Sequence, residues 1–285
     1  MNGGAGWLER RVIAYAHQGG SWEAPSSTMH AITHALSAGA TGIELDVHAT
    51  ADGELVVCHD ATVDRTTAAH GAIASFTLAE LQRLDFSYWW IPGADVMPGR
   101  PAQEYLLRGR APQDPTLGIA TLRQVLESFP GVVLNLDIKQ TAPVVAPYEE
   151  ALARLLLEFE RTDDVIVASF LDPATDAFRR FAPDIATSAG TMATAEAWRA
   201  VQAGQAIPDS PVVAFQVPER QGDLVVVDER FVTSAHAAGK AVHVWTVNDR
   251  DAMERLVGLG VDGIISDRPS ALCGVLEAAG VSWAP

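Results

Sequence analysis

Short apolar runs recur along the chain, and most are followed by a segment whose apolar residues have helical spacing. The runs are rich in β-branched residues and have the length of a typical strand. Alternation of such strands with helices indicates a parallel sheet built from βα units. We recognise eight runs, at residues 12–16, 42–47, 132–138, 165–169, 185–189, 212–216, 241–246 and 263–266.

Candidate helices accompany these runs. Several open at Asp, Ser, Thr or Pro and close near Gly, the residues that favour the two ends of a helix. They cover residues 28–38, 122–129, 148–160, 173–181, 194–203, 229–238, 250–259 and 269–279. Eight strands and about as many helices predict one α/β domain over residues 1–285, folded as a (β/α)8 TIM barrel.

An insertion after the second strand interrupts this regular pattern. Residues 48–131 separate the second and third runs, far more than an ordinary βα connection needs. Within an inserted segment at about 54–120, we expect a short extra strand at 54–59 and a helix at 77–84, with Thr77 and Glu80 forming a capping box. The rest is rich in Pro, Gly and Arg.

An aromatic cluster, Tyr88-Trp89-Trp90, lies within the insertion. Loops near the mouth of a barrel commonly take part in function. The cluster is interpreted either as packing of the insertion onto the barrel or as an apolar wall for the substrate.

Carboxylates interrupt the apolar pattern on two predicted strands. Alternate side chains of a strand share a face, so Glu44 and Asp46 point together while the apolar residues between them face the other way. Asp137 shares a face with Asn135 and Lys139 on the next run. An interior carboxylate is costly to desolvate unless a cation or hydrogen-bond donors compensate it. These three carboxylates predict a metal ion, with an ordinary ion network as the alternative.

The ligand chemistry favours a hard divalent cation. Carboxylate oxygens suit Mg²⁺ or Ca²⁺, whereas Zn²⁺ normally takes His and Cys ligands. The residue types do not distinguish Mg²⁺ from Ca²⁺.

Two histidines frame the acidic residues. His17 directly follows the first strand, and His59 follows the extra strand of the insertion. Catalytic residues of (β/α)8 barrels collect at the carboxyl ends of the strands. His17 and His59 are therefore candidates for a general acid and a general base.

Composition excludes several classes of protein. The chain has 48% hydrophobic residues, two cysteines and a net charge of −16, from 20 Lys and Arg against 36 Asp and Glu. Disordered, collagen-like and disulfide-stapled proteins do not have this composition. An acidic field repels nucleic acid. Without an apolar signal core or a long apolar stretch, we expect a cytoplasmic protein with no membrane anchor.

Six motifs resemble those of the glycerophosphodiester phosphodiesterases. AHQGG is similar to the family's AHRG opening, and GIELDVHATADGELVVCHDATVDRTT to its ElDV…T.Dg..Vv.HD..l.RtT block. LDIK, GIATLRQVLESFP, VHVWTVND and GVDGIISDRP resemble its IEiK, ipTLeevL, vWTvN and GvDGiiTD.P segments in the same order. The resemblance implies a TIM barrel of the phosphatidylinositol-phosphodiesterase-like kind.

The resemblance also implies a function and a set of residues. The function is hydrolysis of glycerophosphodiesters to glycerol 3-phosphate and an alcohol, with a divalent cation and a small-molecule phosphodiester substrate. The implied roles are acid–base catalysis by two histidines, metal binding by three carboxylates, and substrate contacts by four further side chains. In the same order these residues are His17 and His59; Glu44, Asp46 and Asp137; and Lys139, Gln18, Gln216 and Trp245.

The chain departs from the family pattern at three points. Gln18 replaces the usual Arg and cannot make its bidentate ionic contact. Ser26 stands where the family has the Glu of P-E-N-T, with Glu23 nearby, and Asp137 shortens a ligand from Glu. Two alternatives stay open: a lysophospholipase D-type phosphodiesterase acting on lipids, and a catalytically impaired barrel that binds a phosphodiester.

Overall fold

Eight parallel strands form the central barrel of the protein. The computed structural model describes residues 5–281, so residues 1–4 and 282–285 lie outside the described range. The barrel strands are β1 (Ile13–His17), β2 (Gly42–Ala49), β5 (Val133–Ile138), β6 (Val165–Ala168), β7 (Ala186–Thr187), β8 (Ala214–Pro218), β11 (Ala241–Trp245) and β12 (Gly263–Ser266). All eight predicted strands are present, and no strand end differs from its prediction by more than two residues.

The strands follow the order β7-β6-β5-β2-β1-β12-β11-β8. A parallel bridge between Ser188, just after β7, and Ala214 of β8 joins the two ends of this series. The predicted (β/α)8 barrel is therefore confirmed. At this junction the neighbouring strands are joined by a single bridge.

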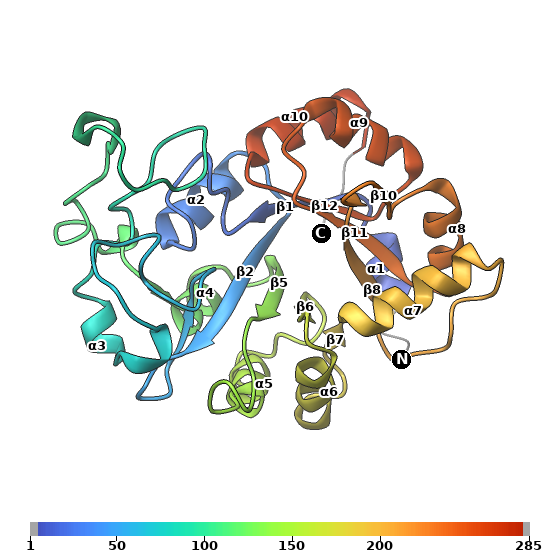
Figure 1. The fold of residues 1–285 in the computed structure, drawn as a ribbon, viewed down its shortest axis with the longest axis horizontal. Coiled ribbons are helices and arrows are strands. Elements are labelled where there is room, and N and C mark those ends of the chain that lie inside the picture. Colours follow the sequence, from blue (N-terminus) through green and yellow to red (C-terminus); the bar gives the residue numbers. More distant parts are fainter. Residues whose placement is uncertain (1–4, 282–285) are drawn as a thin grey trace.

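Helices surround the strands (Figure 1). They are α2 (Met29–Ser37), α4 (Leu122–Ser128), α5 (Glu149–Glu158), α6 (Asp172–Phe181), α7 (Thr191–Gln202), α8 (Glu229–Ala237), α9 (Arg250–Leu259) and α10 (Pro269–Ala278). Their starts match the expected caps: the side chains of Thr28, Thr121, Asp228 and Asp249 each accept a hydrogen bond from a backbone N–H in the first turn.

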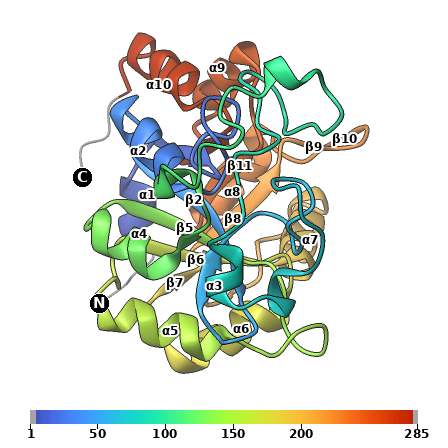
Figure 2. The same ribbon diagram turned by 90° about the vertical axis from the view of Figure 1, so that its left-hand side faces the viewer.

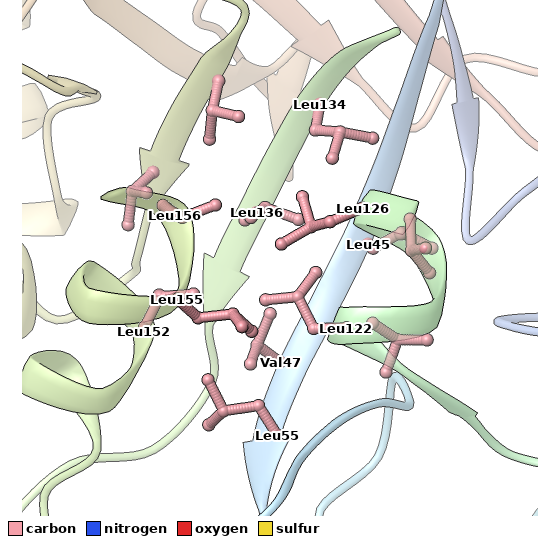
Figure 3. Packing of buried hydrophobic residues seen from close by; sticks show 14 of the residues in the cluster. Leu45, Val47, Leu55, Leu122, Leu126, Leu134, Leu136, Leu152, Leu155 and Leu156 are labelled. Atoms are coloured by element: carbon pink, nitrogen blue, oxygen red, sulfur yellow. The ribbon is translucent and has the colours of Figure 1, made fainter. Parts of the chain in front are cut away.

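Apolar side chains between the strands and the outer helices form the core (Figure 3). On β2 and β5 every second residue faces these helices, which turns the intervening polar residues toward the barrel interior. The outward set from strands and helices includes Leu45, Val47, Leu134, Leu136, Leu122, Leu126, Leu152 and Leu156. The alternation predicted from sequence is thus realised, and it places Glu44, Asp46 and Asp137 inside the barrel.

The insertion leaves the barrel after β2 and returns before α4. Its extra strand β3 (Leu55–Val57) pairs antiparallel with β2 and with the short β4 (Ala120–Thr121). The predicted helix is the short α3 (Leu78–Leu81), with the Thr77–Glu80 capping box formed. Three 3-10 turns, η1 (Ile73–Ser75), η2 (Ala102–Glu104) and η3 (Pro115–Leu117), complete it.

Two small elements complete the fold. Helix α1 (Ala5–Glu9) precedes β1, and a two-residue hairpin of β9 (Arg220–Gln221) and β10 (Leu224–Val225) follows β8. Figure 2 shows that the insertion, in cyan and green, and this hairpin, in orange, extend from the same side of the barrel. Over residues 5–281, no helix is long and apolar enough to cross a membrane.

Candidate active site

A cavity of about 700 Å³ opens at the carboxyl ends of the barrel strands. Eight of the nine side chains with a predicted role line it: His17, Glu44, Asp46, His59, Asp137, Lys139, Gln216 and Trp245. The strand ends therefore bring residues from widely separated parts of the sequence into one space, as the barrel architecture predicts.

Register between β2 and β5 sets the acidic part of the cavity. Glu44 lies opposite Asn135 and Asp46 opposite Asp137, because the two parallel strands pair from Gly42 to Val47 without a break. The two strands thus present one polar face as two adjacent rows.

Lys139 lies between two of these carboxylates. Its Nζ is 3.0 Å from Asp46 Oδ1 and 3.4 Å from Asp137 Oδ2. Burial opposes the charge on this ammonium group, but the surrounding carboxylates outweigh it and raise the pKa of Lys139. The lysine is therefore a stable cation next to the acidic side chains.

The carboxylates remain incompletely compensated. Asp46 Oδ2 and Asp137 Oδ1 are buried and accept no hydrogen bond from the described residues. Burial, reinforced by repulsion from Asp46, raises the pKa of Glu44 to about 8. Burial also raises the pKa of Asp137 to about 6 despite the attraction of Lys139. Lys139 therefore leaves one oxygen of Asp46 and one of Asp137 without a partner, so this pair is electrostatically suited to a further cation.

These residues fit a divalent cation by donor type, but they do not already form a coordination shell. Among residues 5–281, no group of three or more His, Cys, Asp or Glu side chains stands in a metal-binding arrangement. The unpaired oxygens of Asp46 and Asp137 are the hard donors that Mg²⁺ and Ca²⁺ prefer. Lys139 lies on the other oxygen of each of these two carboxylates.

A carboxylate holds His17 at the end of β1. His17 Nδ1 donates to Asp267 Oδ1 at 2.6 Å, while Ser21 and Asn248 donate to Asp267 from the other sides. Nε2 of His17 is 3.8 Å from Glu44 Oε2. Burial opposes protonation of this ring, but the bond to Asp267 and the charge of Glu44 prevail and raise the pKa of His17 to about 9.

His59 is oriented in the same way by the residue that follows it. His59 Nδ1 lies 2.6 Å from Asp60 Oδ1, and Arg65 Nε donates to Asp60 Oδ2 at 2.7 Å. The rings of His17 and His59 approach edge to face, with centroids 5.9 Å apart. Each histidine thus has Nδ1 on a carboxylate, which makes Nε2 the nitrogen that is available for proton transfer with a substrate.

Gln18 differs from the other predicted site residues. It is buried with a positive φ of 53°, in a turn that continues through Gly19 and Gly20. It is absent from the described residues that line the cavity; its backbone N–H donates to Glu44 Oε2, and its amide Nε2 lies 3.1 Å from His17 Nε2. The side-chain oxygen has no partner among the described residues. Protonated His17 carries an N–H at Nε2, which needs an acceptor. The side-chain oxygen of Gln18 is the atom of that amide that can accept this hydrogen bond.

Gln216 and Trp245 lie on the opposite wall of the cavity. The amides of Gln216 and Asn135 exchange two hydrogen bonds across the barrel, at 3.0 and 3.1 Å. The Trp245 ring packs edge to face on Phe170, with centroids 5.4 Å apart. Gln216 is therefore partly satisfied within the protein, whereas Trp245 presents an aromatic surface to the cavity.

The contacts of the aromatic cluster in the insertion favour its interpretation as packing over that as an apolar wall for the substrate. Among the described lining residues, Tyr88, Trp89 and Trp90 do not occur. Instead, the guanidinium of Arg108 stacks on Tyr88 and Trp89, and Trp89 Nε1 donates to the carbonyl of Thr67.

Glu23 faces away from the cavity as well. It accepts from the backbone and hydroxyl of Ser270 at the start of α10, and His34 Nε2 is 3.4 Å away. Among the described residues that line the cavity it does not occur. Its carboxylate is therefore engaged by the start of α10 and by His34 of α2.

Sequence reasoning missed the residues that support the histidines. Asp267 and Asn248 are hundreds of residues from His17 in the chain, yet β12 lies next to β1. Asp267, in the SDRP segment, directly follows β12, and Asn248, in the WTVND segment, lies three residues after the end of β11. Their position just beyond barrel strands was the available signal. Asp60, which supports His59, is the next residue in the sequence.

A (β/α)8 barrel with such a polar cluster at the carboxyl ends of its strands is typical of an enzyme. Residues 17–271 match the model of the Glycerophosphoryl diester phosphodiesterase family, and the chain belongs to that family. A glycerophosphodiester phosphodiesterase of Caldanaerobacter subterraneus subsp. tengcongensis is 30% identical over 95% of this chain and 100% of that protein. The predicted family and class of enzyme are confirmed.

Solved structures agree on the fold. A putative glycerophosphoryl diester phosphodiesterase from Silicibacter pomeroyi has a TM-score of 0.74 at 24% identity, covering 99% of this chain and 100% of that chain. An Oleispira antarctica phosphodiesterase, solved in complex with the product sn-glycerol-3-phosphate, has a TM-score of 0.66 at 24% identity, covering 95% and 99%.

Proposed function

We propose that this barrel, with its insertion at 54–120, acts as one catalytic domain that hydrolyses glycerophosphodiesters to glycerol 3-phosphate and an alcohol. The proposal rests on one observation above all: two carboxylate-supported histidines, three acidic residues and a lysine face one cavity. The named activity of the Caldanaerobacter relative and the product bound to the Oleispira protein support the same reaction.

The two histidines divide the proton transfers. His59 takes the proton from the glycerol hydroxyl next to the phosphate, and that oxygen attacks phosphorus. His17, protonated because of its raised pKa, gives its proton to the oxygen of the departing alcohol. Water then opens the cyclic phosphate, with His17 as base and His59 as acid. Each histidine ends in its starting protonation state.

The charged residues bind and stabilise the phosphoryl group. Lys139 donates to a phosphate oxygen after leaving Asp46 and Asp137. A divalent cation, Mg²⁺ or Ca²⁺, held by Glu44, Asp46 and Asp137 would supply further positive charge to the same oxygens. Gln216 offers a polar contact and Trp245 an aromatic wall. Gln18 acts by orienting His17, since it contacts that ring at Nε2.

Phosphorus NMR with glycerophosphocholine tests the proposal. We expect glycerol 3-phosphate to appear, to stop after chelation of divalent ions and to resume when Mg²⁺ or Ca²⁺ is restored. His17→Ala and His59→Ala should each lower turnover by about 10²–10⁴-fold, the usual contribution of a general acid or base. Unchanged turnover in either folded variant contradicts the assigned roles, and turnover in chelator contradicts the metal.

The cytoplasmic location stays a prediction. The catalytically impaired alternative loses its main argument if glycerol 3-phosphate is formed, because the replacement of Arg by Gln18 is then compatible with chemistry.

A further inference from the structure

The cavity is much larger than its catalytic end. Its volume of about 700 Å³ lies within the range of pockets that enclose drug-sized ligands, which is more than a glycerol phosphate fills. From the histidines it continues past Gln216 and Trp245 to α7 and the β9–β10 hairpin. We call this continuation the annex and define it by Phe170, Trp198, Leu224, Val226 and Trp245.

The annex differs in chemistry from the catalytic end. Its defining side chains are aromatic or aliphatic, and most of the residues between them are small or carry hydroxyl groups, with the amide of Gln221 and the guanidinium of Arg199 as the larger polar groups. Among the described residues, the acidic side chains that line the cavity are confined to β2 and β5, and the charged side chain at the annex is Arg199. A cationic head group such as choline would meet a like charge there and no carboxylate.

Apolar annex residues are also left partly exposed. Phe170 is 53% exposed and Leu224 is 45% exposed, although both line the cavity. Covering such side chains with an apolar ligand removes apolar surface from water, and this burial favours binding.

Hairpin geometry explains why Leu224 faces the annex. Leu224 pairs with Gln221, and both line the cavity, whereas the neighbouring pair of Val225 and Arg220 is not among the described lining residues. Successive residues of a strand point to opposite faces. Val225 is 41% exposed, so it is almost as exposed as Leu224 while facing elsewhere.

We propose that the annex binds a linear apolar chain attached to the phosphodiester, so that the preferred substrates are phosphodiesters carrying such a chain on one alcohol. This inference rests on the proposed function for the position of the phosphate. The chain could belong to the departing alcohol or, as an acyl group, to the glycerol. Both sources share the chemistry that Phe170, Trp198 and Leu224 recognise.

A series of glycerophosphoalkanols from ethanol to octanol tests the first source. Each methylene buried contributes about 0.8 kcal/mol, which is about fourfold in kcat/KM. We expect kcat/KM to rise at least tenfold along the series in the wild type. A matched octanoyl lysophosphatidylcholine, compared with glycerophosphocholine below the micelle concentration, tests the second source. A flat dependence in both arms overturns the proposal.

Two variants separate the cavity from the outer surface. In Leu224→Asp the ratio of kcat/KM for the octyl and ethyl substrates should fall at least tenfold, while in Val225→Asp it should equal that of the wild type. Equal losses in both variants, seen only above the micelle concentration, would instead indicate that the exposed apolar residues dock on lipid aggregates, and would overturn the annex as the binding site.

Calorimetry with ethyl phosphate and octyl phosphate gives a readout independent of turnover. The wild type and Val225→Asp should bind octyl phosphate at least tenfold more tightly than ethyl phosphate, and Leu224→Asp should not. If no phosphodiester is hydrolysed, the proposed function fails. The preference for octyl phosphate over ethyl phosphate still tests whether the annex binds an apolar chain. Equal binding of the two phosphates by the wild type overturns it.

Discussion

His17 and His243 are both enclosed by the barrel, but their protonation is affected in opposite directions. His17, at the carboxyl end of β1, has a pKa raised to about 9. His243, in β11, has a pKa lowered to about 3 because burial disfavours its charged form. Burial opposes the charge in both cases, so the neighbours decide the outcome.

Those neighbours differ between the two ends of the barrel. At the mouth, Asp267 and Glu44 face His17. At the base, His243 packs near Tyr15 and Trp7, with ring centroids 5.3 and 6.2 Å away, and neither ring nitrogen has a partner among the described residues. One end of the barrel is therefore built to hold charge and the other to exclude it.

Replacing Asp267 by Asn should have the largest effect on this contrast. The substitution keeps the shape but removes the charge that stabilises protonated His17. We expect kcat to fall by about 10–100-fold, as for partners that orient a functional side chain. The pKa of His17 falls, so the loss of activity on the alkaline side should begin at a lower pH. A pH profile of kcat and a urea titration measure both effects.

Ser21→Ala is the matched control for this prediction, because it removes a neutral donor to the same carboxylate. Its pH profile should move far less than that of Asp267→Asn. If Asp267→Asn lowers stability but leaves the pH profile unchanged, Asp267 has a structural role and does not set the charge of His17.

The barrel and its acidic face could be predicted because both follow from local patterns. Alternation along β2 placed Glu44 and Asp46 on the interior face, and helix caps such as Thr121 marked the starts of helices. The structure brought the predicted cluster together because parallel strands end at one edge. Its catalytic roles stay predictions.

Other features depend on contacts that sequence spacing does not contain. Asp267 reaches His17 because β12 pairs with β1, which closes the series of strands. Gln18 has a positive φ and places its amide on His17, and it is not among the described residues that line the cavity. The annex needs α7 and the β9–β10 hairpin, and that hairpin is too short to give a periodic signal. Trp89 packs on Arg108, a partner almost twenty residues later.

His243→Leu sharpens the comparison through stability. The native pKa of about 3 lies below the ordinary value of 6.5, so between these values the unfolded state binds more protons and stability falls as the pH falls. From pH 7 to pH 5 this group should cost the wild type about 2 kcal/mol. Urea titrations at both pH values should show a loss smaller by that amount in His243→Leu. Equal losses of stability in the two proteins would mean that His243 binds its proton as readily in the native state as in the unfolded state.

Tyr15→Phe should have the smallest effect. The Tyr15 hydroxyl is fully buried beside His243, and it has no hydrogen-bond partner among the described residues. Removing it abolishes an uncompensated desolvation cost, so stability should stay equal or rise by about 1 kcal/mol. At the mouth, Ser21→Ala removes a hydroxyl that donates to a carboxylate and should lower stability by about 1.5–3 kcal/mol. Urea titrations of the two variants compare hydroxyl groups of opposite status, and a clear loss in Tyr15→Phe would show that the base of the barrel supplies this hydroxyl with a partner, such as a bound water.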